Sequence, residues 1–225
     1  MPILRKNDRK LYFAHIPKTA GSSLYWWLLQ NNWQIANFGG ACSRDRPVRA
    51  DTIFRKEFGI AYFQHEGDHS TLTTSPQHAP ADIWQTWGPF DQSFAIVREP
   101  IARFRSAICY SYDRFINRHK FDNNIATLTK FREEALNRLV TVIEKQPNMA
   151  DNHFLPQQCF ITDQTKLYFF DQDWVSQIGN DLGLSGEIAH MNKSNLKIEL
   201  TEPELRFAEE HFQNDIRWYA DLRAE

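Results

Sequence analysis

The chain has 225 residues, of which 42% are hydrophobic and 24% are charged. That composition is ordinary for a globular protein and excludes a disordered, collagen-like or coiled-coil chain. The formal net charge is −2, so no global basic field points to nucleic acid or a membrane surface, and an anion site would have to be local. At about 150 residues per domain, the length predicts one domain over residues 1–225.

Cysteine usage and the amino-terminal segment bear on the compartment. The three cysteines, Cys42, Cys109 and Cys159, form no CxxC pair, which argues against a disulfide framework or a structural zinc site and fits a reducing compartment. The segment MPILRKNDRK lacks the apolar core of a signal peptide, and the longest strongly apolar run, Leu24–Leu29, is too short to span a membrane. We therefore expect a cytoplasmic protein with no membrane span.

Four short apolar runs predict strands. They are Leu11–Ile16, Ile60–Phe63, Phe94–Val97 and Lys166–Phe170. Each is nearly continuous in apolar residues rather than alternating, which is typical of buried parallel strands. Polar or Pro/Gly turns follow them, and three of the runs lead into helix-like sequence.

Five segments predict helices. They are Gly21–Asn31, Pro100–Arg118, Thr127–Lys145, Trp174–Leu182 and Thr201–Leu222. Thr201 and Glu204 have the spacing of a capping box at the start of the last one. The strand–helix alternation predicts an α/β fold, a three-layer, P-loop-like domain with a mostly parallel central sheet flanked by helices. In such sheets ligands bind beyond the carboxyl ends of the strands.

The first motif follows the first predicted strand and reads HIPKTAGSSL from His15 to Leu24. Backbone N–H groups at a helix start and the helix dipole favour an anion. Gly21 permits close approach, Ser22 and Ser23 add hydroxyl donors, and Lys18 adds a positive charge. The alternative interpretation is a capped helix with a solvated lysine. A Walker A loop would need GxxxxGK[ST], and here the lysine precedes the glycine.

The second motif reads VREPIARFRSAICY and follows the strand Phe94–Val97. Arg98 stands at the strand's carboxyl end, and Ser106 lies eight residues further, about two turns into the next helix. Arginine is suited to bidentate phosphate contacts. Alternatively, Arg98 pairs with a carboxylate and Ser106 only faces a neighbouring helix. Together the motifs indicate a ligand with two separated anionic groups.

These motifs resemble those of sulfotransferases that use 3′-phosphoadenosine 5′-phosphosulfate. HIPKTAGSSL is similar to the family's 5′-phosphosulfate loop, and VREPIARFRSAICY is similar to its 3′-phosphate motif. The carbohydrate-type enzymes, including the heparan 2-O and chondroitin groups, are the most similar. Weaker likeness runs through DNHFLPQ at Asp151–Gln157 and HMNKSN at His190–Asn195.

The resemblance implies the P-loop-like α/β fold, that donor as co-substrate, and a set of site residues. Six would hold the 5′-phosphosulfate: Lys18, Thr19, Ala20, Gly21, Ser22 and Ser23. Arg98 and Ser106 would hold the 3′-phosphate, and Lys193 would close over the nucleotide. Lys18 would also be catalytic, stabilising the bridging oxygen as the bond to sulfur breaks. The acceptor hydroxyl, by resemblance on a carbohydrate, would attack sulfur in line.

A general base must take the proton from that hydroxyl, and histidine suits this role near neutral pH. The sequence after the second strand is FQHEGDH. We expect His65 to be the base, with Glu66 the alternative and His69 the third choice. A histidine satisfied in a turn explains His65 equally simply. A metal site of His65, His69 and His78 lacks a recognised spacing, and we expect no metal requirement.

Two other function classes stay open. A nucleotide kinase or other P-loop NTPase would need Mg²⁺ and a Walker B acid, for which Asp171 is the fair candidate. A non-catalytic binding module would keep the fold without the chemistry. Peptide tyrosine, lipid and small-molecule hydroxyls remain alternative acceptors, and Trp84 and Trp87 are the tryptophans best placed by sequence to stack on a sugar ring.

Overall fold

The computed structural model describes residues 3–37, 62–64, 76–137, 141, 143, 145, 151–189 and 198–224. The chain folds into two compact units. Unit 1 comprises Met1–Arg98 and Gln157–Asn192, and unit 2 comprises Glu99–Pro156 and Lys193–Glu225. Each unit is described by itself below.

Unit 1 is built on a six-stranded sheet. Its strands are β1 (Ile3–Lys6), β2 (Arg9–Phe13), β3 (Gln34–Asn37), β4 (Tyr62–Gln64), β5 (Gln92–Val97) and β6 (Lys166–Phe169), in the order β4-β3-β1-β2-β5-β6. Strand β2 pairs in parallel with β5, β5 with β6, and β3 with β4. The α/β class predicted from the sequence is confirmed.

The expectation of a mostly parallel sheet is wrong, because the sheet is mixed. Strand β1 pairs antiparallel with both of its neighbours, β2 and β3. It forms a hairpin with β2 through a turn at Asn7 and Asp8, where Asn7 has φ 54°. Asn tolerates the left-handed conformation better than most residues that carry a side chain. The short polar strands ILRK and QIAN carry too few apolar residues to be found by a search for buried runs.

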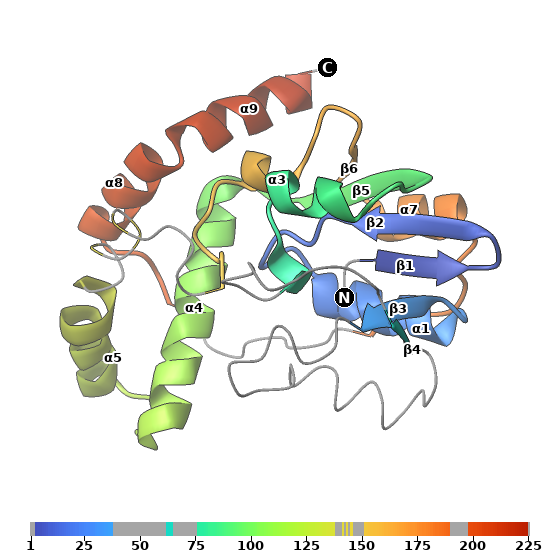
Figure 1. Cartoon of the computed structure of the whole chain (residues 1–225). Helices are drawn as coiled ribbons and strands as arrows, with labels where there is room; N and C mark the ends of the chain where they lie inside the picture. Colours follow the sequence, from blue (N-terminus) through green and yellow to red (C-terminus); the bar gives the residue numbers. More distant parts are fainter. Residues whose placement is uncertain are drawn as a thin grey trace. The chain divides into compact units, whose positions relative to one another are not determined.

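The two faces of this sheet are covered by different elements (Figure 1). Leu11 and Phe13 of β2 point into a core shared with helix α1 (Gly21–Gln30) and helix α7 (Trp174–Leu182). Tyr12, between them, points to the opposite face and stacks on Trp84 with a centroid distance of 4.2 Å. Residues that alternate along a strand face opposite sides of the sheet. The second face therefore packs against aromatic rings of α3 (Ala81–Trp84) and η3 (Gln85–Trp87). The short segment η2 (Pro76–His78) precedes them in the chain.

Unit 2 is helical in its described part. It contains α4 (Pro100–His119), α5 (Ile125–Phe131), the π-helical segment η4 (Arg132–Leu136), α8 (Glu202–His211) and α9 (Gln213–Ala224). An apolar core joins α4, α5 and α8 through side chains that include Phe104, Tyr112, Phe131 and Phe212. The helix expected over Thr201–Leu222 is two helices, because α8 ends at His211 and α9 begins at Gln213.

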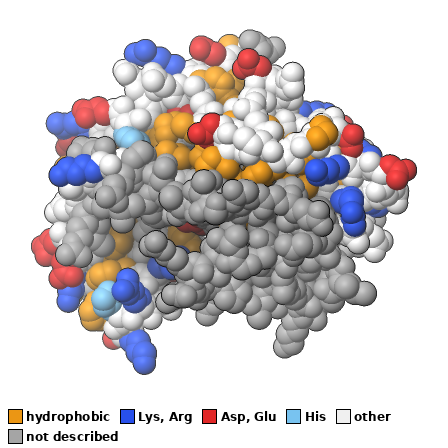
Figure 2. Space-filling view, viewed as in Figure 1, with side chains coloured by type: hydrophobic (Ala, Val, Ile, Leu, Met, Phe, Trp, Pro, Cys, Tyr) orange, Lys and Arg blue, Asp and Glu red, His pale blue; other side chains and the backbone are white. Residues whose placement is uncertain are grey.

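The described surface carries both signs of charge. Figure 2 shows acidic and basic side chains interspersed over the visible described elements, without a region of one sign. This agrees with the net charge of −2. Among the described helices, none combines the length and the apolar character needed to cross a membrane.

Candidate functional site

The loop between β2 and α1 holds an unusual backbone. Lys18 and Ala20 both have left-handed conformations, with φ 72° and φ 69°, and Ala20 is directly followed by the first helical residue, Gly21. Successive residues of opposite handedness direct their N–H groups into a concave, anion-binding nest. The hydroxyl of Thr19, which is 0% exposed, donates to the carbonyl of Ile16 at 2.8 Å and so fixes the turn.

The amino terminus of α1 carries no acidic side chain, unlike the starts of the described helices α3, α4, α7, α8 and α9. Its N-cap Ala20 makes no side-chain cap, and the first turn contains no acidic residue. By contrast, the carboxylate of Asp173 caps α7 by accepting from the N–H of Ser176 at 3.1 Å. Since an acidic cap already neutralises the positive end of a helix dipole, α1 is the better suited of the two to bind an external anion.

Gly21 is required where it stands. A Cβ at this position would lie 1.9 Å from Nε2 of His15. The His15 ring is nearly buried, stacks on Phe13 with a centroid distance of 5.3 Å, and meets the rings of Tyr25 and His78 edge-on. The His15 ring therefore packs against the loop at Gly21. The motif HIPKTAGSSL did not reveal this packing role.

Arg98 meets this loop from the neighbouring strand. Its Nη1 donates to the carbonyl oxygen of Lys18 at 3.2 Å, and its guanidinium lies 4.5 Å from the ring centroid of Phe170. Strands β2 and β5 are parallel neighbours, so their carboxyl ends share one edge of the sheet. The first two motifs thus meet at the edge where the sequence placed the site.

Gln157 fixes the backbone of Arg98. Its Oε1 accepts from the N–H of Arg98 at 3.0 Å, and its Nε2 donates to the carbonyl of Arg98 at 2.8 Å. The Gln157 side chain is 0% exposed. Sequence reasoning missed this residue, although the segment DNHFLPQ that ends in it was singled out.

The other arginines of the second motif lie in unit 2 and have structural partners. Arg103 is buried, and its guanidinium donates to the carbonyls of His153 and Leu155. Arg105 is exposed and pairs with Glu199 at 3.3 Å. Neither competes with Arg98 as a candidate anion ligand.

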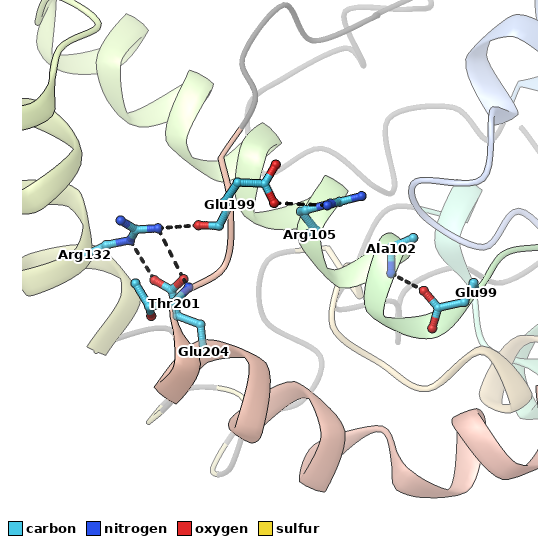
Figure 3. A network of polar contacts seen from close by, with 7 residues as sticks. All are labelled: Glu99, Ala102, Arg105, Arg132, Glu199, Thr201 and Glu204. Carbon is cyan, nitrogen blue, oxygen red and sulfur yellow. Dashed lines mark hydrogen bonds and ion pairs between the residues drawn. The ribbon is translucent and has the colours of Figure 1, made fainter.

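The start of α4 is itself occupied by a carboxylate. Glu99 accepts from the N–H groups of Ile101 and Ala102 at 2.9 and 2.6 Å, as Figure 3 shows for Ala102. An anion would therefore be recognised in this motif by side chains and not by the helix terminus. Ser106, the other predicted ligand, is half-buried on α4.

Several predicted site residues lie outside the described residues: His65, Glu66, His69 and Lys193. Strand β4 ends at Gln64, directly before His65. Its pairings through β3 and β1 give it the same direction as β2. In sheet order it lies three strands from β2, about 14 Å at ordinary strand spacing.

Trp84 and Trp87 are not available to stack on a sugar. They are 4% and 7% exposed. Trp84 stacks on Tyr12, its Nε1 donates to the carbonyl of Phe160 at 2.8 Å, and Trp87 tilts against the same tyrosine at 6.3 Å. The expectation of a stacking surface here is wrong, because these rings form the core of the second sheet face.

A basic cavity of about 410 Å³ lies elsewhere in unit 1. It is lined by Arg5, Lys6, Asn7, Asn32 and Gln34. The hairpin register pairs Lys6 with Arg9, at the amino end of β2. The cavity is thus at the opposite sheet edge from Lys18 and Arg98 and takes no part in the candidate site.

Comparison of the chain with protein-family models, with curated proteins and with solved structures found no match. The arrangement described above therefore rests on the residues themselves. A nest-like loop at an uncapped helix, one lysine, and one arginine held by a buried amide form a cationic edge. Such an edge is suited to bind a phosphate or sulfate ester.

Proposed function

We propose that the protein is a sulfotransferase that moves a sulfuryl group from 3′-phosphoadenosine 5′-phosphosulfate to an acceptor hydroxyl. The observation that carries the proposal is the hydrogen bond from Arg98 Nη1 to the Lys18 carbonyl at 3.2 Å. It joins the two motifs that resemble the family's 5′-phosphosulfate loop and 3′-phosphate motif, although they are 80 residues apart in the chain. We also propose the P-loop-like, three-layer arrangement for the domain.

The loop residues fit an anionic donor. The left-handed Lys18 and Ala20, the uncapped start of α1 and the absence of acidic residues from its first turn favour a phosphosulfate. In this proposal the backbone of residues 19–23 and the hydroxyls of Ser22 and Ser23 hold its oxygens. The buried hydroxyl of Thr19 donates its hydrogen to the carbonyl of Ile16. Thr19 therefore contributes to the donor site through its backbone N–H.

The proposed chemistry is in-line transfer. The acceptor oxygen forms a bond to sulfur while the bond from sulfur to the bridging phosphate oxygen breaks, releasing adenosine 3′,5′-bisphosphate. Lys18 stabilises the charge that develops on that bridging oxygen. The acceptor proton goes to the base, for which His65 is the choice from sequence and Glu66 the alternative. Arg98 and Ser106 hold the 3′-phosphate, and Lys193 closes over the nucleotide.

The test is sulfuryl transfer itself. The protein is incubated with isotope-labelled donor and a panel of carbohydrate, phenolic and lipid hydroxyls, and labelled product is separated from donor. The proposal expects product that disappears in Lys18→Ala and falls at least about 100-fold in His65→Ala. Transfer of a phosphoryl group from ATP with Mg²⁺ instead would establish the kinase alternative, and binding of donor without transfer to any acceptor would favour the binding module.

A further inference from the structure

We infer that Gln157 and Phe170 are positioning residues that preset Arg98 for one anionic group of the ligand, the 3′-phosphate of the nucleotide. This inference rests on the proposed function, and it names the residues of unit 1 that would make the protein selective for one nucleotide over another. Neither side chain is placed to touch the ligand; each acts through Arg98.

Gln157 forms hydrogen bonds to the backbone of Arg98 directly after the last paired residue of β5. Within the ladder, β5 pairs with β6 up to Val97 and Phe169, and the N–H of Phe170 donates to the carbonyl of Val97 at 2.8 Å. After this point, the side-chain amide of Gln157 forms hydrogen bonds with both the N–H and the carbonyl of Arg98, at 3.0 and 2.8 Å. A side-chain amide offers a donor and an acceptor on two separate atoms, as the backbone of a strand does.

Phe170 and Lys18 hold the other end of Arg98. The guanidinium lies 4.5 Å from the Phe170 centroid, within range of a cation–π contact. One Nη1 hydrogen is directed to the Lys18 carbonyl at 3.2 Å. With its backbone, its ring contact and one donor fixed, the planar guanidinium is oriented before a ligand arrives. Arginine presents five donors in a rigid, planar fork that matches the geometry of a phosphate.

Preorganisation of this kind gives selectivity and not only affinity, since little ordering is left for the ligand to bring about. The gain applies to the anionic group that Arg98 contacts and to no other part of the ligand. The predicted signature is a loss confined to the 3′-phosphate when Gln157 or Phe170 is changed. A residue that merely supports the fold would weaken every ligand together.

The experiment compares two nucleotides by calorimetry, adenosine 3′,5′-bisphosphate and adenosine 5′-phosphate. Its variants are Gln157→Leu, Phe170→Leu and the matched control Gln158→Leu, whose side chain is exposed in the same 3₁₀ turn, η5 (Gln157–Phe160). We expect Gln157→Leu and Phe170→Leu each to lower the affinity ratio of the two nucleotides about tenfold, with the 5′-phosphate affinity held within about twofold. Gln158→Leu leaves the ratio unchanged.

Two further readouts separate positioning from fold. In an Arg98→Ala background, Gln157→Leu should lower the ratio no further, because both act on one contact. Amide hydrogen exchange at Arg98, measured by NMR, should accelerate in Gln157→Leu and stay slow in Phe170→Leu. If Gln157→Leu does not fold, the affinity ratio of Phe170→Leu still tests the positioning role. Equal losses for both nucleotides, or full additivity with Arg98→Ala, would overturn the inference. A wild-type protein that binds neither nucleotide would instead overturn the proposed function, and this inference with it.

Discussion

Arg98 and Lys18 are joined by a hydrogen bond from the Arg98 guanidinium to the Lys18 carbonyl oxygen, 3.2 Å long. The contact uses one donor of the arginine and the backbone carbonyl of the lysine. It holds the two basic residues at one edge of the sheet. Two basic residues at one edge are well suited to an anionic ligand.

Replacing Lys18 should mainly lower turnover, whereas replacing Arg98 should mainly weaken nucleotide binding. Lys18→Ala should lower turnover by about 10²–10³-fold with little loss of nucleotide affinity, because its charge is needed most as the leaving oxygen develops charge. Arg98→Ala should weaken binding of adenosine 3′,5′-bisphosphate by about 10–100-fold. Arg105→Ala, which removes an exposed partner of Glu199, is the control and should change neither quantity. If Lys18→Ala and Arg98→Ala both fold and both retain wild-type kinetics, the site assignment is lost.

Gly21→Ala should disturb the loop through His15. The new Cβ would lie 1.9 Å from His15 Nε2, and relief of such overpacking typically costs about 1–3 kcal/mol of unfolding free energy. His15→Ala should recover part of that loss in the double variant, since it removes the ring that clashes. Urea unfolding of the two single variants and the double variant measures the coupling.

The matched control for that cycle is Gly179→Ala. A Cβ there would lie 3.1 Å from Trp27 Cη2, so a different ring has to adjust and His15→Ala should rescue nothing. Strict additivity between Gly21→Ala and His15→Ala would show that the imidazole does not fill the space beneath the loop.

The buried hydroxyl of Tyr25 should make the protein sensitive to alkali. The hydroxyl has no hydrogen-bond partner among the described residues, and burial raises the pKa of Tyr25 well above its ordinary value. A raised folded-state pKa stabilises the fold below the unfolded pKa of about 10, and this contribution is lost as pH rises beyond it. Tyr25→Phe should therefore be neutral or stabilising by up to about 1 kcal/mol at pH 7, and should lose less stability than wild type between about pH 9 and 11.

Tyr168→Phe provides the comparison for that measurement. Its hydroxyl donates to Asp181, so removing it should destabilise the protein by about 1 kcal/mol at pH 7. Chemical unfolding of both variants, at pH 7 and between about pH 9 and 11, measures their unfolding free energies. A Tyr25→Phe protein that is less stable than Tyr168→Phe at pH 7 would contradict the account of an unsatisfied hydroxyl.

Arg132 should be the most sensitive ion-pair residue among the described residues of unit 2. Its Nε donates to Glu204 at 2.9 Å and its Nη2 to the carbonyl of Glu199 at 2.6 Å, while Glu204 also accepts from the N–H of Thr201 at 2.7 Å (Figure 3). Glu204 is nearly buried and Arg132 is 27% exposed. Arg132→Met should cost about 1–3 kcal/mol, because a mostly buried carboxylate loses its cation.

Lys130, which forms an exposed pair with Glu134, offers the control for that change. Lys130→Met should alter the unfolding free energy by less than about 1 kcal/mol. Urea denaturation of the two variants makes the comparison, and equal small effects would mean that the buried pair contributes no more than a surface one.

The sequence was most informative where apolar periodicity or helix caps are strong. Helix α7 has the expected bounds, Trp174–Leu182, and α1 and α4 begin at Gly21 and Pro100 as predicted. These starts are marked locally, by a glycine after a turn and by a proline in the first helical position.

What the sequence did not reveal depends on contacts between distant segments. Strand β1 is short and half polar, and only its pairing with β2 and β3 makes it part of the sheet. Gln157 acquires its role from a position 59 residues away in the chain. Trp84 and Trp87 stand in a segment that is polar in sequence, and their burial follows from Tyr12, which no local pattern indicates.

We propose that this edge of unit 1 binds a nucleotide through its 3′-phosphate and its 5′-anionic group. Calorimetry with adenosine 3′,5′-bisphosphate, with ATP as comparator and each with and without Mg²⁺, tests it most directly. We expect binding of the bisphosphate to be independent of the metal, stronger than that of ATP, and weakened by Arg98→Ala. Preference for ATP with Mg²⁺, or bisphosphate binding that is indifferent to Arg98, would contradict it.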